Sequence, residues 1–378
     1  MVRAAHLSFR PPRPGEEPPS ARKKGRGATS NASGRYESQR TEGTPFDDNA
    51  PVNDDAFRLK TDVTVERARK IITYNTSPFV GFDRSINPYR GCEHGCIYCF
   101  ARPTHAYMGL SPGLDFESKL FAKPSAPALL TRELSNTKYV PRPIAMGTNT
   151  DPYQPIERKF RLMRGIISTL ARFSHPFTIL TKSHLITRDI DLLAPLAAKN
   201  LTRVMISITT EDKALARHME PRASSPERRF DAVAQLAQAG VPVGVMTAPM
   251  IPGLNDDELE SLLERSKEAG AEFVGYTIIR LPLEVSTLFQ EWLQIYGPDR
   301  AGKVMRLIRE MNGGKDYDVE WSRGREIKAP YAKLIAHRFH RAARSLGLDK
   351  KPDALDLSQF KRPSDPEKQP GLFDDAVD

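Results

Sequence analysis

Short apolar runs alternate with helical segments from residue 86 onward, and this alternation limits the folds that the chain can adopt. The runs are rich in β-branched residues, and the segments between them carry apolar residues at helical spacing, as at Met163, Ile166 and Leu170. The predicted strands are 143–149, 177–182, 203–209, 241–248 and 272–279, with one further strand before Cys92. The sequence therefore predicts six β–α units.

Strands that alternate with helices imply a parallel sheet, so the fold class is α/β. The predicted strands are almost entirely apolar, as expected for a sheet that is covered on both faces. Such units fit either a doubly wound sheet or an incomplete barrel, and the periodicity does not distinguish the two. In both folds ligands bind at the carboxyl ends of the strands, so we expect the functional site at that edge.

The composition divides the chain into four parts. Residues 1–60 form a predicted disordered basic arm, whose first 45 residues hold nine Lys or Arg and four Glu. Residues 61–285 form the predicted core, 286–348 a helical extension and 349–378 a flexible tail. No apolar run is long enough for a membrane span, and no signal peptide is recognisable. Because the clustered cysteines indicate a reducing compartment, we expect a cytoplasmic protein without membrane contact.

The chain contains three cysteines, Cys92, Cys96 and Cys99, all within eight positions. Thiolates bind soft metals, so this spacing indicates a metal site. One alternative is zinc with His94 or His105 as the fourth ligand, and another is a set of buried thiols without metal. The third is an iron–sulfur cluster with three protein ligands, which leaves one iron open for a second molecule. The polar, glycine-containing loop around the cysteines argues against buried thiols without a ligand.

The C-x3-C-x2-C spacing, with Tyr98 directly before the third cysteine, resembles the signature of the radical S-adenosylmethionine (SAM) enzymes. The resemblance covers most of residues 80–285 and implies a partial, TIM-like (β/α)6 barrel with the cluster loop after its first strand. It also implies a 4Fe-4S cluster held by the three cysteines, with SAM bound to the open iron. Such enzymes cleave SAM reductively to a 5′-deoxyadenosyl radical, so an electron donor such as flavodoxin or ferredoxin is expected.

The resemblance places the SAM contacts at the carboxyl ends of the strands. In this family a glycine-rich stretch after the second strand binds the amino group of SAM, and GTN occupies that position here, with Asp151 nearby in place of the usual glutamate. A lysine at the end of the third strand is suited to pair with the SAM carboxylate. Polar residues at strand ends also commonly form turns, so each assignment has a structural alternative. The predicted SAM contacts are Tyr98, Gly147, Thr148, Asn149, Lys182, Ser207, Thr209, Thr247 and Ala248.

Several stretches resemble the spore photoproduct lyase group, also called DNA repair photolyase-like proteins. They include NPYRGCEHGCIYCF, FTILTKS, HMEPRASSPERRF and AGVPVGVMTAPMIPGLND. The resemblance implies lyase or repair chemistry on nucleic acid. Founding members return a hydrogen from an additional cysteine, relayed by a tyrosine directly after the third cluster cysteine. This chain has no fourth cysteine and has Phe100 at that position, so we expect the same initiating chemistry without that return route.

Basic segments and the tail suggest macromolecular partners. A basic helix around 330–346 and the N-terminal arm are suited to nucleic acid, although a solvated helix face and a solubilising tail explain the same pattern. QPGLF in the tail resembles peptides that bacterial repair and replication proteins insert into the sliding clamp, with Gln369, Leu372 and Phe373 as anchors. The candidate nucleic-acid residues are Arg323, Arg325, Lys328, His337, Arg338, Phe339, His340, Arg341 and Arg344.

The sequence is therefore compatible with three functions. The first is a radical SAM enzyme, of lyase or repair type, acting on a nucleic-acid base. The second is the same chemistry on a small molecule or a protein. The third is a binding protein that is stabilised by a metal and catalyses nothing.

Overall fold

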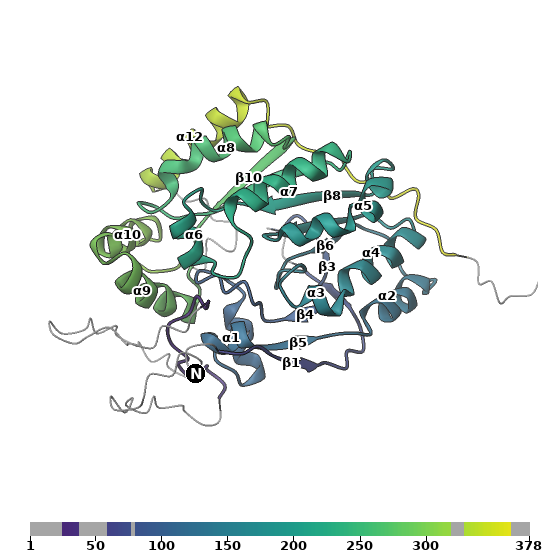
Figure 1. Ribbon diagram of the computed structural model, residues 1–378, viewed down its shortest axis with the longest axis horizontal. Coiled ribbons are helices and arrows are strands. Elements are labelled where there is room, and N and C mark those ends of the chain that lie inside the picture. Colours follow the sequence, from purple (N-terminus) through teal and green to yellow (C-terminus); the bar gives the residue numbers. More distant parts are fainter. Residues whose placement is uncertain (1–24, 38–58, 77–79, 319–328, 364–378) are drawn as a thin grey trace, which may run out of the picture.

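The computed structural model describes residues 25–37, 59–76, 80–318 and 329–363 (Figure 1). Within these residues the main sheet has the strand order β10–β9–β8–β7–β6–β3–β2. All neighbours from β3 to β10 pair in parallel, and β2 pairs antiparallel to β3. The sheet does not close on itself, so the predicted α/β fold with an incomplete barrel is confirmed. The strands are β2 (Ile72–Tyr74), β3 (Arg84–Ile86), β6 (Ile144–Met146), β7 (Phe177–Thr181), β8 (Thr202–Ser207), β9 (Val243–Met250) and β10 (Phe273–Ile278).

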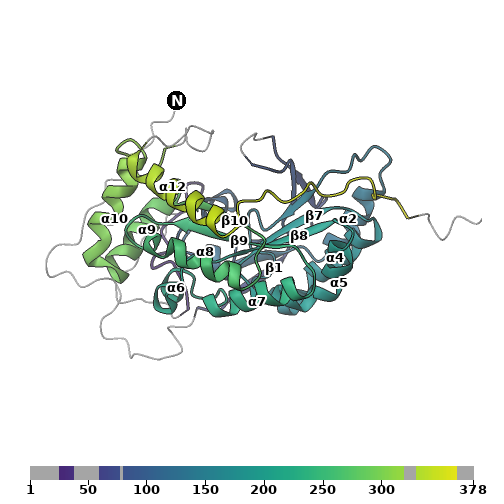
Figure 2. The ribbon, with the colours of Figure 1, turned by 90° about the horizontal axis from the view of Figure 1, so that it is seen from above.

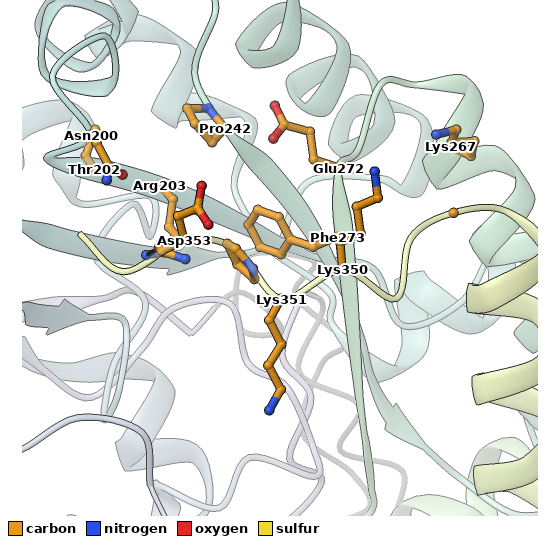
Figure 3. Close-up of a pocket in the computed structure, with 12 residues that line it drawn as sticks. Asn200, Thr202, Arg203, Pro242, Lys267, Glu272, Phe273, Lys350, Lys351 and Asp353 are labelled. Carbon is orange, nitrogen blue, oxygen red and sulfur yellow. Dashed lines mark hydrogen bonds between the residues drawn. The ribbon is translucent and has the colours of Figure 1, made fainter. Parts of the chain in front are cut away.

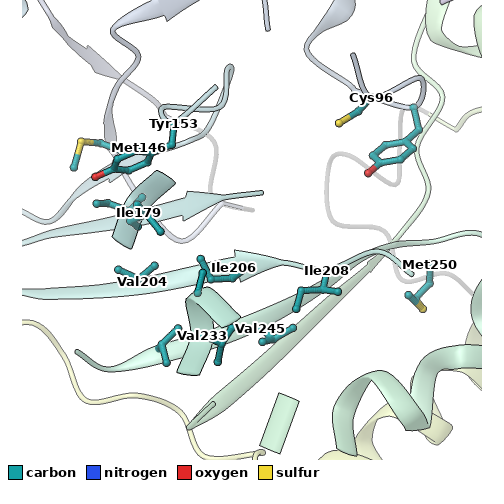
Figure 4. Packing of buried hydrophobic residues seen from close by; sticks show 14 of the residues in the cluster. Cys96, Met146, Tyr153, Ile179, Val204, Ile206, Ile208, Val233, Val245 and Met250 are labelled. Carbon is teal, nitrogen blue, oxygen red and sulfur yellow. The ribbon is translucent and has the colours of Figure 1, made fainter. Parts of the chain in front are cut away.

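One face of the sheet is covered by α4 (Leu162–Arg172), α5 (Ile190–Ala197), α7 (Pro226–Gln238) and α8 (Leu259–Glu268) (Figure 2). The α7 helix follows its sequence signals, because Ser225 is the N-cap, Pro226 is the first helical residue and Gly240 lies beyond the end with a φ of 73°. Apolar side chains of this helix and of the strands beneath it pack together in the core, among them Val204, Ile206, Val233 and Val245 (Figure 4).

The opposite face of the sheet is less covered. Leu180 and Met205 are register partners on adjacent strands, so their side chains share this face, and both are half-buried. Met246 pairs with Ser207 one row further toward the carboxyl ends and is also half-buried. This face therefore leads from the sheet interior to the edge where the candidate site residues lie.

A second sheet lies beside the first and was not predicted from the sequence. Its order is β1–β5–β4, with β5 parallel to β1 and antiparallel to β4. These strands have two to four residues each, which is too short for the alternation of apolar residues to identify them. The elements of this region are β1 (Asp62–Val65), β4 (Tyr89–Arg90), η2 (Arg102–Thr104), η3 (Ala106–Met108), α1 (Leu114–Ser118), β5 (Lys119–Ala122) and α2 (Ala126–Ser135).

The predicted helical extension forms α9 (Glu284–Tyr296), α10 (Pro298–Met311) and α12 (Pro330–Ser345). The α12 helix packs against α8 and β10, where the Phe339 and Tyr276 ring centroids are 4.4 Å apart. The shorter helices are α3 (Glu157–Phe160), η4 (His184–Asp189), α6 (Lys213–Met219) and η5 (Asp256–Glu258). None of the helices in the described part of the chain is long and apolar enough to cross a membrane.

Two segments predicted to lack structure are packed against the core. Residues 25–37 belong to the predicted arm, yet Arg26 and Ala28 are buried. Residues 349–363 belong to the predicted tail, yet Phe360 packs against Tyr139, Phe173 and His175. The average composition of both segments predicts disorder, because the few residues that anchor each segment to the core contribute little to that average. Apart from Leu59 and Lys60, the remaining parts of the predicted arm and tail lie outside the described residues.

Candidate cofactor site

The three cysteines lie in one loop between β4 and η2. Cys92 and Cys96 are buried, and Cys99 is half-buried. A backbone hydrogen bond from Cys92 N to Phe116 O (3.0 Å) ties the start of the loop to α1, and one from Cys99 N to Cys96 O (3.2 Å) closes a turn within it. Burial raises the pKa of the Cys92 thiol, and the charges of Asp151 and the other two cysteines raise it further. The three thiols lie within eight positions of one loop, so they form one candidate donor set.

Three thiolates are the protein ligands that a cluster with one open iron requires, whereas a structural zinc ion requires a fourth ligand. Among the described residues, no group of three or more His, Cys, Asp or Glu side chains converges on one metal position. His94 Nδ1 faces Asp151 Oδ2 at 3.3 Å, and His105 Nε2 lies 2.9 Å from the carbonyl oxygen of Lys119, so one nitrogen of each ring contacts a protein partner. In a cluster, each thiolate binds a different iron, so the three sulfurs need not converge on one point.

Lys182, Ser207 and Thr209, which the sequence predicts as SAM contacts, meet at the carboxyl ends of adjacent strands. The Lys182 ammonium donates to Ser207 Oγ at 2.6 Å and to Thr209 Oγ1 at 3.2 Å. The Ala248 carbonyl accepts from the same group, 3.0 Å from Thr209 Oγ1 and 3.4 Å from Lys182 Nζ. Lys182 keeps 14% of its side chain exposed, so its charge is available to a ligand at this edge.

Glu220 stands at the centre of this group, and sequence reasoning missed it. Its carboxylate is fully buried, lies 3.2 Å from Lys182 Nζ, and forms a further ion pair with buried Arg229. Burial by itself raises the pKa of Glu220, but the charges of Arg229 and Lys182 outweigh burial and lower the pKa below its ordinary value. The site therefore holds a buried, ionised carboxylate between two cations. Both residues lie in HMEPRASSPERRF, but a short polar stretch does not reveal which of its side chains turn inward.

Tyr98 connects the cysteine loop to this group. Its hydroxyl donates to the Glu220 carboxylate and lies 3.1 Å from Thr209 Oγ1. The Lys182 ammonium lies 5.6 Å from the centre of the Tyr98 ring, within cation–π distance. The predicted aromatic residue before the third cysteine is thus buried, and it joins the thiol loop to the lysine at the strand ends.

Gly147, Thr148 and Asn149 form the turn directly after β6. Gly147 has a φ of 91°, and a Cβ at this position would lie 2.0 Å from the Leu180 carbonyl oxygen, so only glycine allows the turn to cross the end of β7. The Asn87 side chain holds the two residues that follow Gly147. Its Nδ2 donates to Thr148 Oγ1 at 3.1 Å, and its Oδ1 accepts from Asn149 N at 3.0 Å. The turn is half-buried and lies beside the Lys182 strand.

Asp151, considered as a substitute for the glutamate of the family, has its oxygens occupied by protein partners. Thr181 Oγ1 donates to Oδ1 at 2.6 Å, and the backbone N–H of Lys182 donates to Oδ2 at 2.8 Å. Burial raises the pKa of Asp151, but His94 opposes this, and the net pKa is lowered. The carboxylate therefore ties the end of β7 to His94 in the cysteine loop, which is a structural role.

The Thr247 side chain does not join the group around Lys182. It pairs in register with Tyr276 and donates to the Gly275 carbonyl at 3.2 Å. Successive side chains of a strand point to opposite faces, so Thr247 lies on the face of Val245, which packs in the helix-covered core. Its neighbour Ala248 contributes the carbonyl described above.

A cavity of about 460 Å³ lies at the other end of the sheet (Figure 3). It is lined at the starts of β8 and β10 and by the segment that follows α12. None of the sequence-predicted SAM contacts lines it. Because ligands of parallel sheets bind at the carboxyl ends of the strands, we place the functional site at the edge with Lys182 and not in this cavity.

Comparison with known proteins identifies the family. Residues 86–265 match the radical SAM superfamily, and this stretch contains the three-cysteine loop and every predicted SAM contact. The chain contains a radical SAM domain. The superfamily implies a 4Fe-4S cluster and SAM, and the three-thiol loop beside Lys182, whose side chain is partly exposed, is a donor set that fits both.

The proteins similar to this chain differ in what their names state. An uncharacterised protein of Mycobacterium tuberculosis (strain H37Rv) is 38% identical over 60% of this chain and 68% of its own length. A radical SAM Nα-GlyT isomerase of Pseudomonas phage M6 is 24% identical over 69% of this chain and 51% of its own length. A solved spore photoproduct lyase, complexed with a dinucleoside spore photoproduct, superposes with a TM-score of 0.52 at 16% identity. It covers 75% of this chain and 79% of the lyase, and this likeness shows the shared fold.

The residues predicted to contact macromolecular partners differ in their exposure, and some of them lie outside the described residues. Of the predicted residues, His337, His340, Arg341 and Arg344 are exposed on α12, whereas Arg338 pairs with Glu260. Lys333, which was not predicted, is also exposed on this helix. Phe339, predicted to interleave with these charges, is buried against Tyr276, so it is a core residue and offers no stacking surface. The other predicted partner residues, Arg323, Arg325, Lys328, Gln369, Leu372 and Phe373, lie outside the described residues.

Proposed function

We propose that this protein is a radical SAM enzyme that cleaves SAM reductively and acts on a base in nucleic acid, in a lyase or repair type of reaction. The observation that carries the proposal is the connection of the three-thiol loop to Lys182 through Tyr98 and Glu220. This arrangement provides thiolates for a cluster and a cation for a carboxylate ligand at the same edge of an open parallel sheet.

Each residue has a defined task in this proposal. Cys92, Cys96 and Cys99 hold the cluster, and the Lys182 ammonium binds the carboxylate of SAM. Glu220 keeps Lys182 and Tyr98 in place, because its carboxylate pairs with Lys182 and Arg229 and accepts a hydrogen bond from Tyr98. When bound, the cluster and SAM supply a 5′-deoxyadenosyl radical that abstracts a hydrogen atom from the substrate.

The backbone around Gly147, Thr148 and Asn149, the hydroxyls of Ser207 and Thr209, and the Ala248 carbonyl complete the proposed SAM site. These groups surround Lys182 or lie on the adjacent strand end. Half-exposed Leu180, Met205 and Met246 extend this edge toward the uncovered face of the sheet, where we place the substrate. Thr247 is left out of the proposed site because its side chain lies on the other face.

Nucleic acid is the proposed substrate class because of two supporting observations. The solved lyase with the similar fold was captured with a dinucleoside photoproduct. The chain has a net charge of +9, and three exposed cations gather on α12 at Lys333, Arg341 and Arg344, where they are suited to phosphates. A reaction on a small molecule or a protein is the competing outcome of the test below.

The sequence has no fourth cysteine, so the hydrogen-return route of the spore photoproduct lyases is absent in this proposal. Phe100, which follows Cys99, is 61% exposed and has no hydroxyl to relay a hydrogen. With that route absent, the substrate radical would regain its hydrogen from 5′-deoxyadenosine, which would regenerate SAM. Otherwise it would take one electron and one proton from an external reductant, in which case 5′-deoxyadenosine would be released as a product.

Deuterium transfer tests the substrate class. Reduced, reconstituted protein is incubated anaerobically with SAM and with UV-irradiated oligonucleotides that carry deuterated thymidine, and the adenosine products are analysed by mass spectrometry. Deuterium in SAM or 5′-deoxyadenosine supports a nucleic-acid substrate, and an Arg341→Glu/Arg344→Glu variant should lower the yield at physiological salt. If SAM is cleaved but no deuterium is transferred from any oligonucleotide, the nucleic-acid part of the proposal is wrong.

A further inference from the structure

Residues 26–35 form a segment, here called the N-terminal strap, which lies against α1 and against the cysteine loop at Gly95. Arg26 Nη1 donates to the Glu117 carbonyl at 2.5 Å, and Arg26 Nη2 donates to Leu59 O at 2.7 Å. The next two backbone N–H groups, of Gly27 and Ala28, donate to the Glu117 carboxylate at 2.9 and 2.8 Å. The strap is thus held to α1 by both the backbone and the side chain of one glutamate.

The same glutamate holds the cysteine loop. Arg102 and Glu117 form an ion pair at 2.5 Å, and both side chains are completely buried. Arg102 also donates to the Cys96 carbonyl at 2.9 Å and to the Gly95 carbonyl at 3.1 Å. Glu117 therefore links the strap on one side to the backbone of Gly95 and Cys96 on the other.

The strap and the loop approach each other at their glycines. A Cβ added to Gly27 would lie 1.8 Å from the Gly95 carbonyl oxygen. Gly95 has a φ of 68° and lies between Cys92 and Cys96, so its position determines how the loop presents the first two thiols. No side chain fits between these two segments, and the contact is backbone against backbone.

The far end of the strap is attached to the helical extension. Ser30 Oγ donates to Glu291 Oε2 on α9 at 2.6 Å, and Arg35 pairs with Glu284 of the same helix at 2.6 Å. The backbone carbonyl of Ser30 also accepts a hydrogen bond from Leu114 N, at the start of α1, at 3.2 Å. The strap therefore joins three parts of the molecule, namely α1, the cysteine loop and α9.

We infer that the N-terminal strap is a positioning element of the cluster loop, which holds Gly95 in place and keeps Cys92 and Cys96 closed to solvent. This inference rests on the proposed function for the cluster, but the closure of the loop is a property of the chain without any cluster. A chain lacking the strap would leave the buried Arg102–Glu117 pair without its cover, and the thiol loop would open more often.

The test compares Gly27→Ala with Gly302→Ala, a control on α10 where a Cβ would meet no atom within 4 Å. In the metal-free protein under reducing conditions, alkylation of Cys92 and Cys96 by iodoacetamide is followed by peptide mass spectrometry. We expect about tenfold faster alkylation in Gly27→Ala and an unchanged rate in Gly302→Ala. An Arg26→Met variant, which creates no steric clash, should show a smaller increase in the same direction.

A second readout uses the reconstituted protein. Iron loss to a chelator should be faster in Gly27→Ala and in Arg26→Met than in wild type. If alkylation differs as expected but wild type binds no iron, the strap inference stands and the proposed function fails. If Gly27→Ala does not fold, Arg26→Met decides the matter, and alkylation rates of Arg26→Met equal to those of wild type overturn the inference.

Discussion

At the scale of single residues, the candidate site depends on how a buried carboxylate is kept ionised. Glu220 is removed from water, which by itself favours the neutral acid, yet Arg229 and Lys182 supply enough opposite charge to lower its pKa. The cost of burying these charges is offset only while all partners are present. The group is therefore sensitive to the loss of any one member, and each loss has a different expected consequence.

Replacing Lys182 with methionine tests ligand binding. Glu220 retains Arg229, so the protein should fold, but the cation proposed for the SAM carboxylate is lost. We expect SAM affinity to fall by about 10- to 100-fold, the range for losing a charged hydrogen bond. Isothermal titration against wild type measures this, with Lys333→Met on the exposed face of α12 as the matched control. Equal affinities for Lys182→Met and wild type would remove Lys182 from the site.

Replacing Glu220 with alanine tests stability instead. The change leaves Arg229 fully buried without its carboxylate partner, which should lower the free energy of unfolding by about 3–5 kcal/mol. Urea unfolding measures the difference. The control is Glu264→Ala on the exposed side of α8, for which we expect a change within about 0.5 kcal/mol. A loss below about 1 kcal/mol for Glu220→Ala would contradict the electrostatic account of this group.

At the scale of elements, the sequence identifies strands and helices where apolar residues repeat, and it misses elements that depend on single anchors. The strand at 177–182 is found as β7 (Phe177–Thr181), and the helix beginning at Ser225 is found as α7. The predicted strand at 143–149 is shorter in the structure, because Gly147 turns the chain after Met146. The strap is missed because its anchors, Gly27 and the Glu117 carboxylate, are distant in sequence.

The C-terminal segment provides a prediction on pH. Phe360 packs its edge against buried His175, whose Nε2 lies 2.8 Å from the Tyr139 hydroxyl and whose Nδ1 lies 2.9 Å from the Pro176 carbonyl. A carbonyl only accepts, so Nδ1 donates to it and Nε2 accepts from Tyr139 in the neutral ring. Burial lowers the pKa of His175 from 6.5 to about 4, because a charged ring would lack solvation there.

The sign of this shift determines where stability is lost. Between pH 6.5 and about 4 the unfolded chain binds a proton that the folded protein does not, so stability is full above pH 6.5 and falls as the pH drops toward 4. The loss should approach about 3 kcal/mol at the acid end. Urea unfolding at several pH values measures it, and a His175→Gln variant should show a flatter profile. Parallel profiles for the two proteins would show that His175 does not titrate as described.

At the scale of the whole molecule, the fold was predictable and the details of the site were only partly so. The six parallel strands follow from the alternation of apolar runs with helices. Their arrangement in chain order and the place of the cysteine loop were implied by the resemblance to the radical SAM enzymes. Lys182, Ser207 and Thr209 could be anticipated because parallel strands end at one edge. Glu220 and Arg229 could not, since their convergence depends on how the chain folds back between β8 and α7.

The central claim is that the thiol loop and the lysine edge together form a site for reductive SAM cleavage. It is tested most directly by reconstituting the protein anaerobically with iron and sulfide, reducing it, adding SAM and measuring 5′-deoxyadenosine by mass spectrometry. We predict a brown protein with about four irons per chain that releases 5′-deoxyadenosine, and a folded Cys96→Ala variant that binds no cluster and releases none. A colourless protein that binds one zinc ion and leaves SAM intact would contradict the account.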